Sequence, residues 1–299
     1  MLEPLQPGDL VDIIAPGSQK NPERLKKAFG FLESWGLRVR APKNLFGEDP
    51  FYTNSILLRT TFLRDALEAR DSKAVWCLRG GYGSTRLLET LQSFSDPLPE
   101  KFFIGFSDIT ALHLFLYQKW GWNTCHGPTL GQLADGLAGP SSAEALRRYL
   151  FKGTRPGFSN LIPLNQAAHD TELLIAPVTG GNTSLIQSSL GTYWQIQTEG
   201  TFIFLEDIDE KPYRTLERLE HMRQAGIFDK AKAVFLFDFN FNQDQEDQQS
   251  YLYSQAFKQF SCEVSLPVFK GFGMGHTKTN FPFVMGSRMI YKNSSLMPC

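Results

Sequence analysis

The sequence of 299 residues is poor in cysteine, has no long apolar run and carries no excess of charge of either sign. Its four cysteines lie far apart without a CxxC pair, which argues against a disulfide framework or a zinc ribbon. No run of about 18 apolar residues occurs, so we expect no membrane-spanning helix. Lys and Arg total 30 against 31 Asp and Glu, so no basic excess favours nucleic acid or an anionic membrane as a partner.

The first residues also lack the features of a secretory signal. No basic region precedes the first apolar run, and acidic residues stand at Glu3, Asp9 and Asp12. Together with the scattered cysteines, this favours a reducing compartment, and we predict a cytoplasmic protein. Hydrophobic residues make up 42% and charged residues 20%, as in an ordinary soluble protein, and the length suggests about two domains.

Strand-like and helix-like segments alternate over the first half of the chain. Short apolar runs and apolar residues at helical spacing distinguish the two kinds of segment. The predicted strands cover residues 10–15, 37–40, 74–78 and 102–106, and the predicted helices cover 21–35, 55–70, 84–91 and 109–119. This alternation predicts an α/β fold with a mostly parallel sheet and flanking helices. We expect this N-terminal domain to carry the nucleophile of the site discussed below.

The second half is predicted as a smaller α/β or β-rich domain. Residues 151–176 have no clear period, so we interpret them as a crossover linker between a domain of residues 1–150 and one of residues 177–299, with the active site between the domains. The predicted elements are a turn at 178–182, helices at 183–190 and 212–224, strands at 201–205, 233–237, 266–269 and 283–285, and a solvated acidic loop at 240–249.

Ser107 is the first candidate for chemistry, because it stands where a buried strand runs directly into a helix. Sites in open α/β sheets lie beyond the carboxyl ends of strands. A serine in such a turn can project its hydroxyl, and the following N–H groups, such as that of Asp108, can face a developing oxyanion. The segment does not match GxSxG, and Ser-Asp is also a common helix N-cap, so both interpretations stay open.

The glycine-rich loop of residues 79–84 (RGGYGS) is the second candidate. Its backbone could approach a ligand closely, and the start of the next helix favours an anion. Neither GxGxxG nor a Walker sequence is present, so a nucleotide site has weak support. An oxyanion donor and a plain tight turn remain as alternatives.

His276 is the third candidate, because glycines flank it and predict an exposed loop rather than a core position. Histidine is the usual general base near neutral pH, and a carboxylate normally orients it. Glu206 and Asp207, at the end of the strand TFIFL, are the candidates for that carboxylate, although they could instead cap the helix after Pro212. No paired histidine spacing supports a metal site.

These segments together resemble the LD-carboxypeptidase family of serine peptidases. The resemblance extends from about residue 8 to 290 and rests on motifs in a fixed order. They read GDLVDIIAPGS, LRGGYGSTRLL, FIGFSDITALH, HGP, GGNTSL, FLEDIDEKPYRTLERLEHMRQAGIF and GFGMGHTKTNFPFVMG. The resemblance implies a cytoplasmic homodimer without metal or organic cofactor. Its substrate would be a murein tetrapeptide, from which it removes the terminal D-alanine in peptidoglycan recycling.

The family motifs also imply a role for individual residues. Ser107 matches the nucleophile, Glu206 the triad carboxylate and His276 the base. Backbone N–H groups of Gly81 and Asp108 match the oxyanion hole. A binding module without catalysis would have lost part of the triad, whereas all three residue types are present here.

Two further expectations concern the substrate. Arg79 could pair with a substrate carboxylate or could simply pack beside the glycine loop. Relatives with the same triad instead confer immunity to a peptide-nucleotide antibiotic, and an aromatic residue that stacks on the nucleobase would favour that function. Phe151, Phe158 and Trp194 are the candidates for such stacking.

Overall fold

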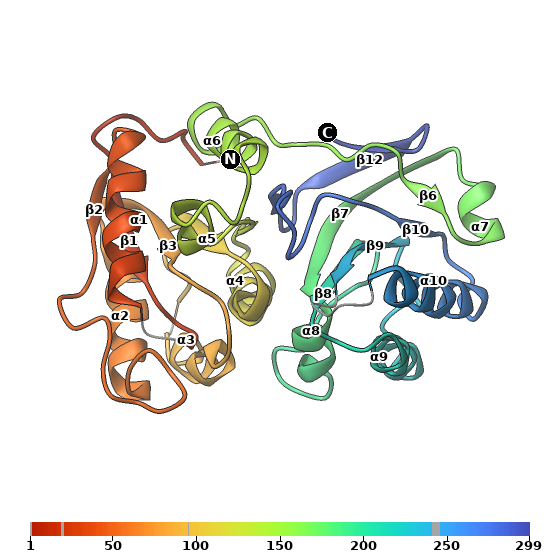
Figure 1. Cartoon of the computed structure of the whole chain (residues 1–299), viewed down its shortest axis with the longest axis horizontal. Coiled ribbons are helices and arrows are strands. Elements are labelled where there is room, and N and C mark those ends of the chain that lie inside the picture. The colour runs from red at the N-terminus through yellow and green to blue at the C-terminus, as the bar shows by residue number, and fades with distance from the viewer. Residues whose placement is uncertain (1, 19–20, 95, 241–245) are drawn as a thin grey trace. The chain divides into compact units, whose positions relative to one another are not determined.

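The computed structural model describes residues 2–18, 21–94, 96–240 and 246–299 (Figure 1). The chain forms two compact units. The first comprises Met1–Arg155 and Phe281–Val284, and the second comprises Pro156–Asn280 and Met285–Cys299. The C-terminal part of the chain therefore returns to the first unit for a short stretch before it completes the second.

The first unit contains a six-stranded sheet in the order β11-β5-β4-β3-β1-β2. All neighbouring strands pair in parallel except β11 and β5, which are antiparallel. Its elements are β1 (Leu10–Ile14), α1 (Pro22–Ser34), β2 (Arg38–Arg40), α2 (Ile56–Glu68), β3 (Ser72–Cys77), the 3₁₀ turn η1 (Ser84–Leu87), α3 (Leu88–Gln92), β4 (Phe102–Gly105), the 3₁₀ turn η2 (Ser107–Ile109), α4 (Thr110–Trp120), β5 (Cys125–His126), α5 (Leu130–Ala134), α6 (Pro140–Lys152) and β11 (Phe283–Val284).

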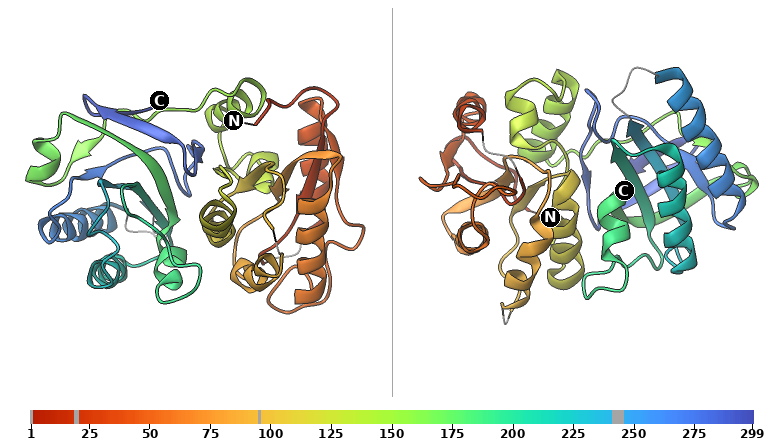
Figure 2. Two further views of the ribbon diagram at one scale, coloured as in Figure 1. Left: turned by 180° about the vertical axis from the view of Figure 1, so that it is seen from behind. Right: turned by 60° about the horizontal axis from the view of Figure 1, so that its bottom comes forward.

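Helices cover both faces of this sheet, which explains why its central strands are almost wholly apolar. Helix α1 packs against α5, whereas α2, α3 and α4 contact one another in sequence. The right view of Figure 2 shows α1 and α2 on opposite sides of the sheet. All four residues of β4 are buried, as expected of a parallel strand covered on both sides. Local signals set the helix ends, since Asn21 caps α1 and Gly121, at φ 72°, ends α4.

The second unit contains a seven-stranded sheet in the order β13-β12-β7-β8-β9-β10-β6. Strands β7 to β10 are parallel, and the outer strands β12, β13 and β6 are antiparallel to their neighbours. Its elements are β6 (Ile162–Pro163), α7 (Gln166–His169), β7 (Leu173–Asn182), α8 (Thr183–Ser189), β8 (Phe202–Ile208), α9 (Pro212–Gln224), β9 (Ala233–Asn240), α10 (Glu246–Cys262), β10 (Val268–Lys270), β12 (Arg288–Lys292) and β13 (Ser295–Pro298).

Phenylalanine dominates the core of this second sheet. Phe204 contacts Phe235 and Phe237 with ring centroids 5.3 and 5.1 Å apart, and Phe235 stacks on Phe269 at 5.2 Å. Figure 1 shows α8, α9 and α10 together on one side of the central strands. Such ring pairs add to the stabilisation from buried area. The predicted α/β fold is confirmed in both units.

The segment 178–182 was predicted as a turn, and this prediction is wrong, because it forms the end of the strand β7. The reason lies in its two glycines. A Cβ atom at Gly180, where φ is 133°, would lie only 2.0 Å from the carbonyl oxygen of Phe204 on β8. Glycine here permits a close approach of two strands and does not mark a change of chain direction.

The acidic stretch 240–249 is also wrongly predicted in part. Residues 241–245 lie outside the described residues, but residues 246–249 begin the long helix α10. Buried Tyr253, Phe257 and Phe260 give this helix an apolar face at helical spacing. Because the first turns of α10 are polar, the apolar face was not recognised in the sequence.

The predicted crossover at 151–176 contains the end of α6, the short elements β6 and α7, and the start of β7. The domain limits drawn from the sequence stay a prediction. Over the described residues, no helix combines the length and apolarity that crossing a bilayer requires.

Candidate active site

Ser107 follows β4 and Phe106 and begins the turn η2 that leads into α4. Its φ of 64° places it in the left-handed region, which non-glycine residues rarely adopt. No side-chain hydrogen bond caps η2 or α4, and Ser107 is the N-cap of neither element. The N-cap interpretation of Ser107 therefore fails. A serine on a strained turn between a strand and a helix has the geometry of a nucleophile elbow.

The glycine loop after β3 packs directly against this turn. A Cβ atom at Gly80 would lie 2.9 Å from the carbonyl oxygen of Phe106 and 3.1 Å from the Cβ of Ser107. Gly81 has φ 98°, and a Cβ there would lie 2.3 Å from the Oγ of Ser18. Glycine at position 80 thus lets the loop backbone lie beside Ser107, and glycine at position 81 leaves room for Ser18.

Asp108 links the turn to the loop through its side chain. Its carboxylate accepts hydrogen bonds from the backbone N–H groups of Gly83, at 3.3 Å, and Ser84, at 2.9 Å. The hydroxyl of Ser84 donates in return to the carbonyl of Asp108. Burial raises the pKa of Asp108, and these hydrogen bonds oppose that increase. Sequence reasoning assigned Asp108 only a backbone role and missed this side-chain contact, because nothing local distinguishes it from a cap.

Glu206 and His276 form a hydrogen-bonded pair in the second unit. The Nδ1 atom of His276 lies 2.8 Å from Oε2 of Glu206, which is completely buried near the end of β8. Burial disfavours the charged imidazole, but the charge and hydrogen bond of Glu206 outweigh burial and raise the pKa of His276. The loop around His276 was predicted to be exposed. Phe272 and Lys278 in this loop are exposed, whereas the side chain of His276 itself is only 13% exposed. Flanking glycines here serve close packing.

Asp238 and Asn280 hold the loop that carries His276. Oδ2 of Asp238 accepts a hydrogen bond from the N–H of Gly273 at 2.9 Å, and Oδ1 of Asn280 accepts one from Gly275 at 3.2 Å. A Cβ at Gly275, where φ is 136°, would lie 3.1 Å from the carbonyl oxygen of Asp238. Neither of these two polar residues was singled out in the sequence, because their role depends on contacts between distant segments.

Asp207, the other candidate carboxylate, has different partners. Its oxygens accept hydrogen bonds from the amide of Asn182 at 2.9 Å and the hydroxyl of Ser184 at 2.8 Å. Burial, and then the neighbouring charge of Glu206, raise the pKa of Asp207 to about 6. No side-chain cap starts the helix α9, so the capping interpretation of this acidic pair also fails. Glu206 is the residue that contacts His276.

The remaining predicted substrate residues, Arg79 and the three aromatic candidates, are partly or fully buried. Arg79 is half-buried just beyond β3, and burial followed by the charge of Arg24 lowers its pKa. Phe151 packs against Trp35 in the first unit. Phe158 and Trp194 are buried in the second unit. Phe158 and Trp194 therefore offer no open face for a nucleobase, whereas Phe151 is only partly buried.

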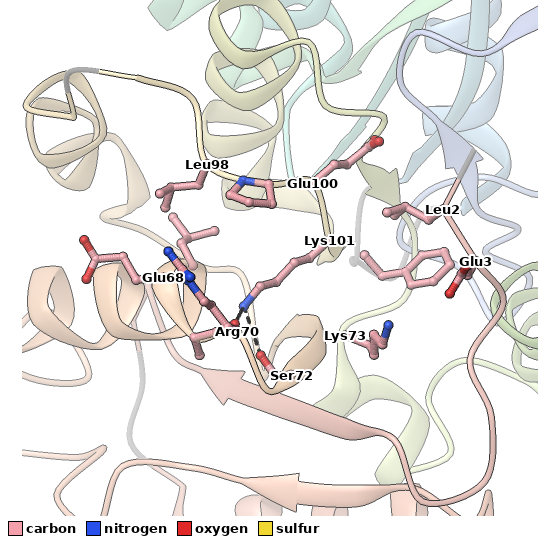
Figure 3. Close-up of a pocket in the computed structure, with 13 residues that line it drawn as sticks. Leu2, Glu3, Glu68, Arg70, Ser72, Lys73, Leu98, Glu100 and Lys101 are labelled. Carbon is pink, nitrogen blue, oxygen red and sulfur yellow. Dashed lines mark hydrogen bonds between the residues drawn. The ribbon is translucent and has the colours of Figure 1, made fainter.

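One pocket of about 940 Å³ lies at the amino ends of β3 and β4, the opposite end of these strands from Ser107 (Figure 3). Its buried cation is Lys101, whose Nζ donates to the carbonyls of Ala66, at 2.8 Å, and Ala69, and to Oγ of Ser72 at 3.0 Å. These three bonds use all the ammonium hydrogens and satisfy carbonyls at the end of α2. The pocket is therefore built around a structural lysine. Over the described ranges, no group of three His, Cys, Asp or Glu side chains is arranged to hold a metal ion.

Comparison with known proteins identifies the family to which the chain belongs. Models of the LD-carboxypeptidase N-terminal domain and C-terminal domain match residues 11–127 and 176–290. The chain belongs to the LD-carboxypeptidase family. A protein of Rickettsia conorii whose name assigns it to the carboxypeptidases is 39% identical over 252 residues, 83% of this chain and 78% of that protein. A Bacillus subtilis protein named for murein peptide carboxypeptidase activity is 30% identical over 289 residues, 95% of this chain and 89% of that protein.

The chain is also similar to a self-immunity protein and to two solved structures. The microcin C7 self-immunity protein MccF of Escherichia coli is 25% identical over 319 residues, 96% of this chain and 91% of that protein. Among solved structures, an MccF-like protein of Bacillus anthracis has a TM-score of 0.84 at 20% identity and covers 99% of this chain and 98% of its own. A muramoyltetrapeptide carboxypeptidase of Oxalobacter formigenes has a TM-score of 0.78 at 25% identity, with coverage of 96% and 97%. Membership of the LD-carboxypeptidase family makes the protein a hydrolase of the peptidase type.

Proposed function

We propose that this protein is a serine-type LD-carboxypeptidase that removes the terminal D-alanine from murein tetrapeptide. The bond that breaks is the amide between an L-configured centre and the D-residue. The names of the relatives from Bacillus subtilis and Oxalobacter formigenes support this substrate class. Peptidoglycan recycling, the cytoplasm and a homodimer follow from the resemblance of the sequence and remain predictions.

The observation that carries the serine mechanism is the buried contact between Glu206 and His276. A carboxylate 2.8 Å from Nδ1 holds the proton on that nitrogen and assigns the role of base to Nε2. The strained turn at Ser107, which lies in the first unit, supports the assignment of this serine as the nucleophile. Neither Ser107 nor Glu206 caps a helix, so capping does not explain their positions.

In this mechanism, Nε2 of His276 takes the proton of the Ser107 hydroxyl as Oγ attacks the carbonyl carbon. The resulting oxyanion accepts hydrogen bonds from the N–H groups of Gly81 and Asp108. The amide bond then breaks, and His276 gives its proton to the departing amine of D-alanine. Water hydrolyses the acyl-enzyme by the same proton transfers in reverse, and Glu206 stabilises the imidazolium in both steps.

The test is mass spectrometry of murein tetrapeptide after incubation with the wild type, Ser107→Ala and Ser93→Ala. Ser93 is an exposed serine after α3 in the same unit and serves as the matched control. We expect the wild type and Ser93→Ala to release one alanine, and Ser107→Ala to release none at any practical time. Release by Ser107→Ala at the original rate would eliminate the serine mechanism.

If folded wild-type protein leaves the tetrapeptide intact, the next substrate to test is a peptide-nucleotide amide, because MccF is among the relatives. Cleavage of that amide would replace murein peptide as the proposed substrate and would retain the triad.

A further inference from the structure

An exposed tyrosine stands in the middle of the glycine loop and stacks on a second tyrosine. The rings of Tyr82 and Tyr52 lie 5.6 Å apart at an interplanar angle of 21°. A side-chain hydrogen bond with Tyr82 raises the pKa of the Tyr52 hydroxyl. Tyr82 is 60% exposed, so burial of apolar area does not account for its position.

Arg59, on the helix α2, lies beneath this pair. Its side chain is 2% exposed, and its guanidinium carbon lies 4.1 Å from the centre of the Tyr52 ring. Nη1 donates to the carbonyl of Gly83 at 3.0 Å and also to that of Pro16, and Nε donates to the carbonyl of Asn54 at 3.2 Å. One buried cation thus ties together three loops of the first unit.

This burial is costly for a side chain that only packs. Desolvation lowers the pKa of Arg59, and its Nη2 has no hydrogen-bond partner among the described residues. A buried donor without a partner is unfavourable, and more so when it is charged. An apolar residue of similar length would avoid this cost but would leave the carbonyls of Gly83, Pro16 and Asn54 without the donor that Arg59 supplies. The side chain therefore holds these backbone segments in place.

The loop itself has little intrinsic preference for its conformation. Gly81 and Gly83, on either side of Tyr82, have φ angles of 98° and 118°. Glycine samples positive and negative φ about equally, so such a loop needs contacts that select one conformation. A Cβ at Gly83 would lie 2.5 Å from the ring of Tyr52 and 3.2 Å from Nη1 of Arg59. Those two side chains therefore lie directly against the loop backbone.

We propose that Arg59, Tyr52 and Tyr82 form a clamp that positions the glycine loop 80–83 for oxyanion binding. This inference rests on the proposed function, because it requires Gly81 to donate its N–H to the oxyanion. The three side chains are positioning residues. Arg59 and Tyr52 contact the backbone of Gly83, and Tyr82, which is itself part of the loop, anchors the loop by stacking on Tyr52.

Loss of the clamp should lower kcat and leave KM almost unchanged. The oxyanion exists only in the transition state and intermediates, so a displaced donor does not weaken binding of the ground-state substrate. A displacement of about 1 Å at a reacting centre costs roughly 10²-fold in rate. We therefore expect Arg59→Met and Tyr82→Ala to reduce kcat by about 10- to 100-fold.

The experiment compares these two variants with their conservative versions and a control. Arg59→Lys keeps a cation over Tyr52, and Tyr82→Phe keeps the stacked ring, so each should retain more activity than Arg59→Met or Tyr82→Ala. Arg64→Met removes a surface arginine from the same helix and should match the wild type. The first readout is kcat and KM for release of alanine from murein tetrapeptide.

The second readout is the rate at which a fluorophosphonate labels Ser107. In that reaction His276 takes the hydroxyl proton, Oγ bonds to phosphorus as the P–F bond breaks, and fluoride leaves. The phosphoryl oxygen occupies the oxyanion site, so no natural substrate is needed. Labelling should slow in Arg59→Met and Tyr82→Ala in proportion to the loss of kcat. A change in overall stability alone would not produce this parallel in folded protein at 25 °C.

Two results would overturn the clamp. One is that kcat and the labelling rate stay unchanged in both Arg59→Met and Tyr82→Ala. The other is that KM rises in these variants while kcat stays unchanged. If Arg59→Met does not fold, Tyr82→Ala decides, because its side chain is exposed. If the wild type is labelled but releases no alanine, the proposed substrate is wrong, and the labelling rates of the variants still judge the clamp. If Ser107 of the wild type is not labelled, the serine mechanism and the clamp both fail.

Discussion

At the scale of single residues, the charge of Glu206 controls the acid–base behaviour of His276. Glu206 is completely buried, and its Oε1 has no hydrogen-bond partner within the described part of the chain. Its interaction with His276 is therefore concentrated in the single contact at 2.8 Å. Because this contact favours the imidazolium, it raises the pKa of His276, and the neutral base predominates only above that raised value.

The first prediction concerns Glu206→Gln. In the wild type, kcat/KM should fall as the pH drops through the raised pKa of His276. The neutral amide removes the stabilising charge, so the acid limb should move to lower pH, and kcat should fall by up to about 10⁴-fold, as in an analogous triad. The measurement is the pH profile of kcat/KM for both proteins.

Glu217→Gln is the control, because Glu217 is an exposed carboxylate on α9. It should leave both the rate and the acid limb in place. An acid limb that stays at the same pH in Glu206→Gln would show that another group governs the profile.

The sequence predicted the three triad candidates but not the side chains that hold them. Ser107, Glu206 and His276 stand at strand ends or in a glycine-flanked loop, which are local signals. The roles of the Asp108 carboxylate and of Asp238 depend on bonds to segments 24 and 35 residues away. No local pattern reports such contacts, because both residues are ordinary acids in their own segments.

At the scale of elements, the twin glycines of β7 show how one signal can have two meanings. Adjacent glycines usually indicate a turn, and the sequence predicted one at 178–182. In the structure, Gly180 and Gly181 pair in parallel with Phe204 and Leu205 of β8. The missing side chains allow the strand backbones to approach, and β7 then delivers Asn182 to its contact with Asp207.

The second prediction compares Gly180→Ala with Gly191→Ala. Both glycines have positive φ, at 133° and 74°, so each substitution adds backbone strain of about 1–3 kcal/mol. Only at Gly180 would the new methyl group meet backbone atoms, whereas nothing lies within 4 Å of the corresponding position at Gly191. We expect Gly180→Ala to lower the free energy of unfolding by about 3 kcal/mol or more.

Urea unfolding followed by far-ultraviolet circular dichroism measures both changes. Equal losses of stability in the two variants would mean that strain alone, without the contact to β8, determines the cost at Gly180.

At the scale of the whole molecule, the first unit is discontinuous in sequence. Its edge strand β11 pairs Phe283 with His126 and Val284 with Cys125. The ring of Phe283 stacks on that of His126 at 4.8 Å, and His126 in turn contacts Phe106, next to Ser107. Residues near the end of the chain therefore complete the core behind the candidate nucleophile.

The third prediction follows from this strand. Phe283→Ala should destabilise the first unit by about 3–5 kcal/mol, because a buried aromatic ring is lost from its sheet. Hydrogen exchange followed by mass spectrometry should show faster exchange in β4 and β5, and little change in β8 and β9 of the second unit.

Tyr251→Ala, which removes an exposed aromatic ring from α10, is the control and should alter neither region. Exchange that increases mainly in β8 and β9 would contradict the assignment of β11 to the first unit.

The sequence predicted the alternation of strands and helices in the first half because each buried strand is a short apolar run there. It did not predict how β11 is used, although it suggested a strand at 283–285. A strand of two residues contains no information about its partner, and pairing with β5 across more than 150 residues is a property of the folded chain.

The late return of the chain has a consequence for biosynthesis. The ribosome makes His126 long before its partner Phe283, with the second unit's sequence almost entirely between them. At about 5–20 residues per second, β5 waits roughly 8–32 s for its neighbour. During that interval one edge of the sheet lacks its final strand and is open to pairing with other nascent chains. The sheet of the first unit can therefore be completed only after Phe283 and Val284 have left the ribosome.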